Sequence, residues 1–283
     1  MSFAQLPSHW LHDPKKDLYT LAELHWRDHR AGGIAALLVL LVLAVRLNAA
    51  GRTALKAGAK VRPDSVSVTW DQLQTITGFA RATVGKAILL LESWGAIEKS
   101  TIGRKNIYRL VDVHKPGSFC LIPEGWIEKN GDPVSRFKNL PATLVGLNAL
   151  KLYFVLLARR NTKIGTTSLS YNGITRWTGI RREDIRKAWG YLDGQHLASV
   201  TFTRDERHNR FTEDDQSQRY VLIGLTNGYT RDDVQLNDAR EGRLPQAVSE
   251  DDFDETAEDR LQPSQRLPNG DQIQPNTDFT KFL

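Results

Sequence analysis

The sequence predicts a mostly helical α+β protein with small β-hairpins, built from two copies of one unit and followed by a disordered acidic tail. Three observations predict this architecture. They are an internal repeat, a pair of short amphipathic helices followed by a hairpin pattern in each copy, and a change of composition after Tyr229. We expect a first domain at residues 1–115, a second at 116–228 and the tail at 229–283.

The repeat consists of three stretches that recur in the same order. They are an aromatic–proline–tryptophan motif, an apolar helix ending in Arg-x-Asn, and a helix pair joined at Thr-Gly. They lie at 3–11, 36–48 and 70–91 in the first copy, and at 119–127, 149–161 and 171–192 in the second. The first copy has additional Gly-, Ala- and Lys-rich residues at 49–66, which predict a loop.

Composition and charge limit the class of protein. The single cysteine, Cys120, excludes an intramolecular disulfide and a cysteine-built zinc site, and it fits a reducing compartment such as the cytoplasm. Residues 229–283 carry 13 acidic against 6 basic side chains, a net charge of −7, whereas residues 1–228 carry 32 basic against 20 acidic, a net charge of +12. A basic body favours a polyanion such as nucleic acid as partner, although it can also serve solubility alone.

The segment 31–45 carries no charge and is bounded by Arg30 and Arg46. It is shorter than the roughly 20 residues that cross a bilayer. We expect it to form a buried core helix of a soluble protein, because the N-terminus also lacks the pattern of a signal peptide.

In the first copy, apolar residues at helical spacing end at Thr77-Gly78, and a second apolar stripe follows at Val84, Ala87, Ile88 and Leu91. Two strands are predicted next, at 97–101 and 106–111. The second copy repeats this pattern, with strands expected at 198–203 and 219–225 around a solvated tip of mixed charge at 204–218.

These stretches resemble the winged-helix DNA-binding family in both copies. The resemblance implies that the second helix of each pair enters a major groove and that the hairpin, or wing, meets phosphate. Both copies depart from the family pattern at the cap of the second helix, where Ala80 and Arg181 replace the usual Ser, Thr or Asp.

The candidate DNA contacts lie at the start of each second helix and at the tip of the first hairpin. They are Arg81, Thr83, Lys86, Arg104, Lys105, Arg181, Arg182, Arg186 and Lys187, with Glu183 also facing outward. Arg81, Arg182 and Arg186 are the candidates for reading bases, because arginine bridges guanine edges. An ordinary solvated charge is the alternative for each of them. Tryptophans 10, 70, 126, 177 and 189 are expected in the core.

Signatures of catalysis are missing from the sequence. No phosphate-binding loop occurs, and His25 and His29 share a helical spacing without a third metal ligand. We therefore expect no enzyme activity, metal site or cofactor.

Tandem winged helices resemble the replication initiators of plasmids and other mobile elements, which implies recruitment of host replication proteins. The tail tip at Phe279, Phe282 and Leu283 would suit such a protein partner, and a purely solubilising tail is the alternative. A transcription regulator and a winged-helix scaffold that contacts protein are the alternative functions. Self-association is left open.

Overall fold

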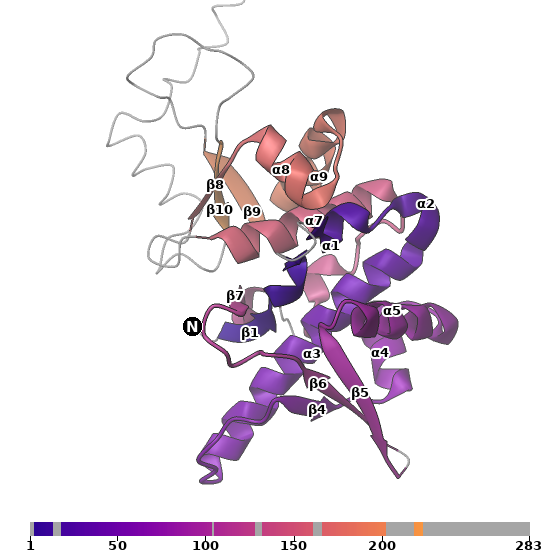
Figure 1. Ribbon diagram of the computed structural model, residues 1–283, viewed down its shortest axis with the longest axis vertical. Coiled ribbons are helices and arrows are strands. Elements are labelled where there is room, and N and C mark those ends of the chain that lie inside the picture. Colours follow the sequence, from indigo (N-terminus) through magenta and orange to yellow (C-terminus); the bar gives the residue numbers. More distant parts are fainter. Residues whose placement is uncertain are drawn as a thin grey trace, which may run out of the picture. The chain divides into compact units, whose positions relative to one another are not determined.

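The structure is a computed structural model (Figure 1). It describes residues 3–13, 18–103, 105–127, 132–160, 166–201 and 218–222. Helices and small antiparallel sheets alternate along these residues, as predicted for an α+β protein. The chain divides into two compact units, Met1–Leu244 and Pro245–Leu283, and every described residue belongs to the first. The prediction of a disordered tail at 229–283 therefore lies outside the described residues.

The first half of the described chain is arranged around one long helix. Its elements are β1 (Phe3–Pro7), η1 (His9–Leu11), β2 (His12–Asp13), β3 (Leu18–Tyr19), α1 (Thr20–Glu23), α2 (Trp26–His29), α3 (Ala31–Lys56), β4 (Ser65–Ser67), α4 (Trp70–Thr77), α5 (Arg81–Ser93), β5 (Ile97–Ile102) and β6 (Lys105–Leu110). Strands β4, β6 and β5 form a three-stranded antiparallel sheet with β6 in the centre, and β2 pairs with β3. The hairpin predicted at 97–111 is present within one residue at each strand end.

The second half repeats this order. Its elements are β7 (Phe119–Pro123), α6 (Glu124–Ile127), η2 (Ser135–Phe137), α7 (Leu144–Arg159), β8 (Thr166–Leu169), α8 (Tyr171–Thr178), α9 (Arg182–Gly194), β9 (Ala198–Thr201) and β10 (Gln218–Leu222). The sheet order β8-β10-β9 corresponds to β4-β6-β5 in the first half. Of the predicted second hairpin, the structure describes strands β9 and β10. The predicted tip at 204–218 is wrong at Gln218, which begins β10, and its other residues lie outside the described residues.

The prediction of a loop at 49–66 is wrong at both ends of that range. Helix α3 continues to Lys56 because Ala49, Ala50 and Ala54 are strong helix formers. At the other end of the expected loop, β4 extends the sheet by pairing with β6. At 26 residues, α3 is long and apolar enough to cross a membrane by length and composition, yet its residues from Ile34 to Val45 are buried inside the protein. The prediction of a buried helix is confirmed.

The two halves are joined by strands β1 and β7, which come from equivalent positions of the repeat. They pair antiparallel, with Phe3 opposite Pro123 and Pro7 opposite Phe119. Gln5 lies opposite Leu121, its own counterpart in the repeat, so the pairing has near-twofold symmetry about this point. The two strands also share one burial pattern along their five residues.

Side chains of both halves meet in one core next to these strands. The Trp10 ring stacks on that of Trp94 at 5.0 Å between centroids and meets Phe154 of α7 edge-on at 6.0 Å. Asn48 Nδ2 donates to Glu124 Oε2 at 2.8 Å, and Arg52 forms an ion pair with the same carboxylate, which is 2% exposed. These contacts join α3 directly to the start of α6.

The tryptophan predictions are right in part. Trp10 is buried in the core, as expected. Trp70, Trp177 and Trp189 are only half-buried and lie at the edge of the core, and cations lie over the rings of the first two. The Trp126 side chain lies outside the described residues.

Candidate nucleic-acid interface

The first helix pair is fixed at both ends of its shorter helix. The Thr69 hydroxyl accepts a hydrogen bond from the Gln72 backbone at 3.2 Å, and the Gln72 side chain accepts one from the Thr69 backbone at 2.9 Å, which completes a capping box. Helix α4 ends at Gly78, whose φ of 73° suits glycine and turns the chain sharply. Helix α5 begins directly after Ala80, which provides no side-chain cap, as predicted.

Helix α5 packs its apolar stripe against α3 and leaves polar side chains outside. The predicted residues Val84, Ala87, Ile88 and Leu91 are all buried. Among the candidate contacts, Arg81 and Lys86 are exposed and Thr83 is half-buried. The structure separates these three, because Arg81 lies against Trp70 while Thr83 and Lys86 line a groove on another side of the helix.

Two cationic side chains lie over the ring of Trp70 at the start of α4. The Arg81 guanidinium carbon lies 5.5 Å from the ring centroid, and the Lys99 ammonium of β5 lies 5.2 Å from it. Gly85 lies beside this ring, and a Cβ built there would be in ordinary van der Waals contact with it at 3.8 Å. Cations above an indole face are attracted by its negative π-cloud, which restricts where they point. Sequence reasoning missed Lys99, because only the sheet brings β5 close to the first residue of α4.

The first hairpin contributes few free cations among its described residues. Lys105 is exposed at the start of β6, and Arg104 lies outside the described residues. Arg109 Nε donates to Glu98 Oε2 at 3.0 Å across the two strands, and this hydrogen bond raises the pKa of Arg109. Arg109 is thus engaged within the sheet.

The second helix pair repeats the geometry of the first. The Ser170 hydroxyl accepts from the Gly173 backbone at 3.1 Å, and α8 ends at Gly179 with a φ of 65°. The Arg182 guanidinium carbon lies 5.6 Å from the centroid of the Tyr171 ring. Both halves therefore place the first residue of the second helix over an aromatic ring that begins the first helix.

The outer surface of α9 carries the remaining candidate residues. Arg181, Arg182, Arg186 and Lys187 are all exposed, and Arg181 provides no side-chain cap. Lys187 Nζ lies 3.5 Å from Asp184 Oδ1 one turn earlier, so this lysine shares its charge with a carboxylate. Three of these four residues lie on α9, and Arg181 is the residue immediately before it.

A buried lysine of α7 holds the C-terminal end of α8. Lys151 of α7 is 3% exposed, and its Nζ donates to the Thr178 carbonyl at 2.9 Å. Burial lowers the pKa of Lys151 to about 8. The bond anchors the C-terminal end of α8 immediately before the Gly179 turn.

A segment of the first half packs onto this second helix pair. The Tyr19 and Trp177 rings lie 4.5 Å apart, and Arg176 lies over the Tyr19 ring at 5.3 Å. A Cβ at Gly179 would lie 2.9 Å from the Ala22 carbonyl oxygen, so α1 fits against the turn only because glycine is there. This contact was not predicted, because no residue pattern at 18–23 indicates a partner.

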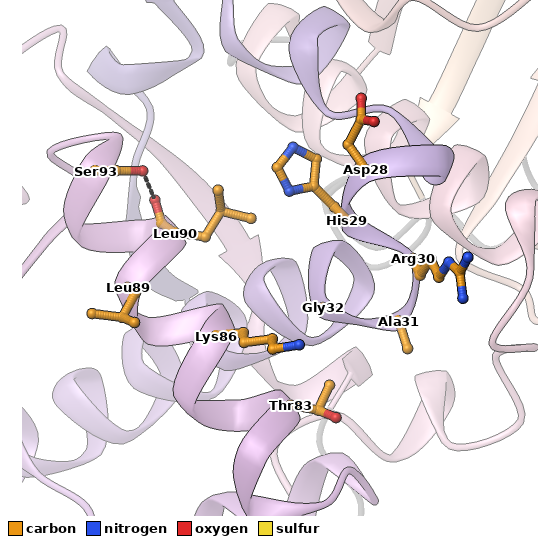
Figure 2. Close-up of a pocket in the computed structure, with 10 residues that line it drawn as sticks. All are labelled: Asp28, His29, Arg30, Ala31, Gly32, Thr83, Lys86, Leu89, Leu90 and Ser93. Carbon is orange, nitrogen blue, oxygen red and sulfur yellow. Dashed lines mark hydrogen bonds between the residues drawn. The ribbon is translucent and has the colours of Figure 1, made fainter.

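The groove beside α5 is the other feature that sequence reasoning missed. It has a volume of about 720 Å³ and lies between α5 and the junction of α2 and α3, as Figure 2 shows. We call it the α2–α5 groove and define it by Asp28, His29, Arg30, Ala31, Gly32, Thr83, Lys86, Leu89, Leu90 and Ser93. Residues 28–32 have the composition of an ordinary polar turn, which gives no sequence signal for a groove.

His25 and His29 lie at the two ends of the short helix α2, and no group of three or more metal-ligating side chains occurs among the residues that the structure describes.

No protein-family model and no curated protein matches the chain. The argument for function therefore depends on the geometry of the helix pairs and of the surfaces around them.

Proposed function

We propose that this chain is a sequence-specific double-stranded DNA-binding protein whose two halves are winged-helix units. One observation carries the proposal: Arg81 over Trp70 recurs as Arg182 over Tyr171. Each arginine begins the second helix of a pair, and this end of the helix contacts base edges in helix-turn-helix proteins. An arginine restricted by an aromatic ring at this point is prepared for the bidentate contact that selects guanine.

The surroundings of the first pair support the same function. Lys99 and Lys105 add positive charge on the adjacent hairpin, where a wing would meet phosphate. The net charge of +12 over residues 1–228 also favours a polyanionic partner. A scaffold that contacts only protein would need neither the repeated arginines nor this charge.

The cellular role that we propose is replication initiation for a plasmid or other mobile element. Two helix pairs in one chain would allow a single molecule to occupy two neighbouring major grooves. The predicted tail tip at Phe279, Phe282 and Leu283 would then recruit a replication protein of the host. The near-twofold pairing of β1 with β7 also suits a single palindrome, which keeps transcription regulation as the second candidate.

The test of DNA reading is the double variant Arg81→Ala with Arg182→Ala. Binding sites are first selected from random duplexes with the unaltered protein, and affinities are then measured by fluorescence anisotropy. The double variant should lose about 30- to 25,000-fold in affinity for the selected duplex, since two bidentate contacts of about 1–3 kcal/mol each are removed. Its affinity for an unrelated duplex should change little.

The control is Lys115→Ala, which removes an exposed positive charge in the connection before β7. It should leave both affinities unchanged. An unchanged sequence preference in the double variant would contradict the assignment of the two arginines. A failure of the unaltered protein to select any duplex would contradict DNA binding itself.

Footprinting on the DNA that flanks the gene separates the two roles. Several protected direct repeats within an A/T-rich region would support replication initiation. One protected palindrome over a promoter would support transcription regulation instead. An absence of protection would contradict both roles.

A further inference from the structure

Residues 18–32 of the first half lie between the two helix pairs (Figure 1). At one end of this segment, α1 packs on α8, with Ala22 against the Gly179 turn. At the other end, the α2–α3 junction forms one wall of the α2–α5 groove. The segment therefore runs from the turn of the second helix pair to the outer side of the first pair's second helix.

The segment is held firmly on its inner side. Leu21 and Leu24 are buried at 0% and 1% exposure, and Trp26 packs against the core. The Arg30 backbone N–H donates to the Trp26 carbonyl at 2.9 Å, which closes the turn of α2. At Gly33 a Cβ would lie 3.0 Å from Leu24, so the start of α3 fits closely beneath the turn. The polar side chains on the outer side of this segment are therefore attached to a backbone that is held in place.

The polar side chains on the outer side of the segment are mainly cationic. Arg27 is 93% exposed, with its Nε 3.4 Å from Asp28 Oδ1, and Arg30 is exposed. From the opposite wall of the groove, Lys86 extends toward Ala31 and Gly32, whereas Arg30 points away from α5 (Figure 2). Two cations, Arg30 and Lys86, therefore belong to the groove lining and Arg27 lies beside it, while Asp28 is the carboxylate in the lining.

Of the two hydroxyls in the groove lining, Thr83 can donate to a phosphate oxygen, whereas the proton of Ser93 is already engaged. Thr83 lines the groove with its side chain half-buried. The Ser93 hydroxyl donates to the Leu90 carbonyl at 2.7 Å, so it offers its lone pairs rather than its proton (Figure 2). Lysine, arginine and threonine donors spread along a groove are the groups that contact sugar-phosphate backbone in protein–DNA complexes.

We propose that the α2–α5 groove and the adjacent Arg27 bind the phosphate backbone of the DNA between the two helix pairs. This inference rests on the proposed DNA-binding function and assigns it a third contact region. Thr83 and Lys86 hold phosphate here, while Arg81 on the Trp70 side of α5 reads bases. Contacts of this kind fix the register of the protein on DNA and act equally on all sequences.

The test uses the full chain with Arg27→Gln and Arg30→Gln. Glutamine removes the charge, and at Arg30, where φ is 44°, it keeps a side chain with a similar backbone cost. The variant should bind every duplex about 10-fold more weakly at 0.1 M salt. Because each lost phosphate contact removes about 0.9 from the slope of log K against log salt, the slope should fall by about 2.

The matched control is Lys115→Gln, in the connection before β7. In Figure 1, β7 and α2 lie on opposite sides of the view. The control variant should change neither affinity nor slope. Hydroxyl-radical footprinting locates the effect, and the double variant should lose protection only between the two strongly protected sites. Thermal unfolding of all variants should match that of the unaltered protein.

Three outcomes would overturn the inference. In the first, the glutamine variant keeps the affinity and the salt slope of the unaltered protein, while Arg81→Ala with Arg182→Ala still abolishes sequence preference. This result would leave the proposed function intact. Another is calorimetric binding of inorganic phosphate that the glutamine variant loses while its duplex affinity is unchanged, which would assign the groove to a free anion. The third is a failure of the unaltered protein to bind any duplex, which would remove the proposed function as well.

Discussion

At the scale of single residues, two glycines of the second half lie in helices for different reasons. Gly146 lies in the first turn of α7, and a Cβ there would lie 2.0 Å from the Pro141 carbonyl oxygen of the preceding loop. Gly190 lies on the outer side of α9, and a Cβ there would meet nothing within 4 Å. Packing explains the first glycine, whereas nothing among the residues that the structure describes explains the second.

The two alanine substitutions should therefore have opposite effects on stability. Gly146→Ala should lower the free energy of unfolding by about 1–3 kcal/mol, because the backbone of the loop must move. Gly190→Ala should raise it by about 0.5–1 kcal/mol, since alanine restricts the unfolded chain and favours helix. Urea denaturation followed by circular dichroism measures both values. A destabilised Gly190→Ala protein would mean that the outer side of α9 is packed in solution.

At the scale of elements, the link between α7 and α8 depends on the protonation of Lys151. Its pKa falls from 10.5 in the unfolded chain to about 8 in the folded protein, so between these values the unfolded chain binds more protons. Stability from this group therefore rises as the pH rises from 8 to 10.5 and is lowest below pH 8. The buried tyrosines act oppositely above pH 10, because burial raises the pKa of Tyr108 to about 12.

Lys151→Met isolates the contribution of this lysine. The difference in unfolding free energy between the variant and the unaltered protein should shift by roughly 2–3 kcal/mol between pH 7 and pH 10, with the unaltered protein gaining. Denaturation at several pH values measures this difference, and the tyrosine contributions cancel in it. A pH-independent difference would mean that Lys151 titrates normally. Lys187→Met, at an exposed position of α9, is the control and should show no shift.

The sequence predicts the elements of each half better than it predicts their surroundings. Apolar spacing and the Thr-Gly signals locate both helix pairs, because these depend on contacts within a few residues. The extension of α3 to Lys56 was missed, because glycine and lysine among the alanines indicate a loop. Lys99 and the α2–α5 groove were missed, because they depend on which elements the fold brings together.

At the scale of the whole molecule, the described residues of the two halves share one core, and a buried polar cluster links α3 to α6 beside it. The Glu124 carboxylate, 2% exposed, binds Asn48 and Arg52 of α3. Removal of one partner from a buried charged pair is costly, because the remaining groups lose their compensation. Since this link joins one half to the other, we expect its loss to weaken both halves together.

Glu124→Gln should therefore lower the free energy of unfolding by about 1–3 kcal/mol and keep a single cooperative transition. Hydrogen exchange read by mass spectrometry should show earlier exchange in α5 and α9 alike. The control is Glu98→Gln, which removes a surface ion pair and should cost less than about 1 kcal/mol. Two separate transitions, or loss of protection in one half only, would show that the halves unfold independently.

The pairing of β1 with β7 has a consequence for mass action. In a twofold homodimer, equivalent strands meet only when two separate molecules associate, and such a contact weakens on dilution. Here both strands belong to one chain, so their meeting is first order and dilution does not part them. The amount of protein in a cell does not decide whether this contact forms, and the two strands can differ in sequence without either needing to recognise its own copy.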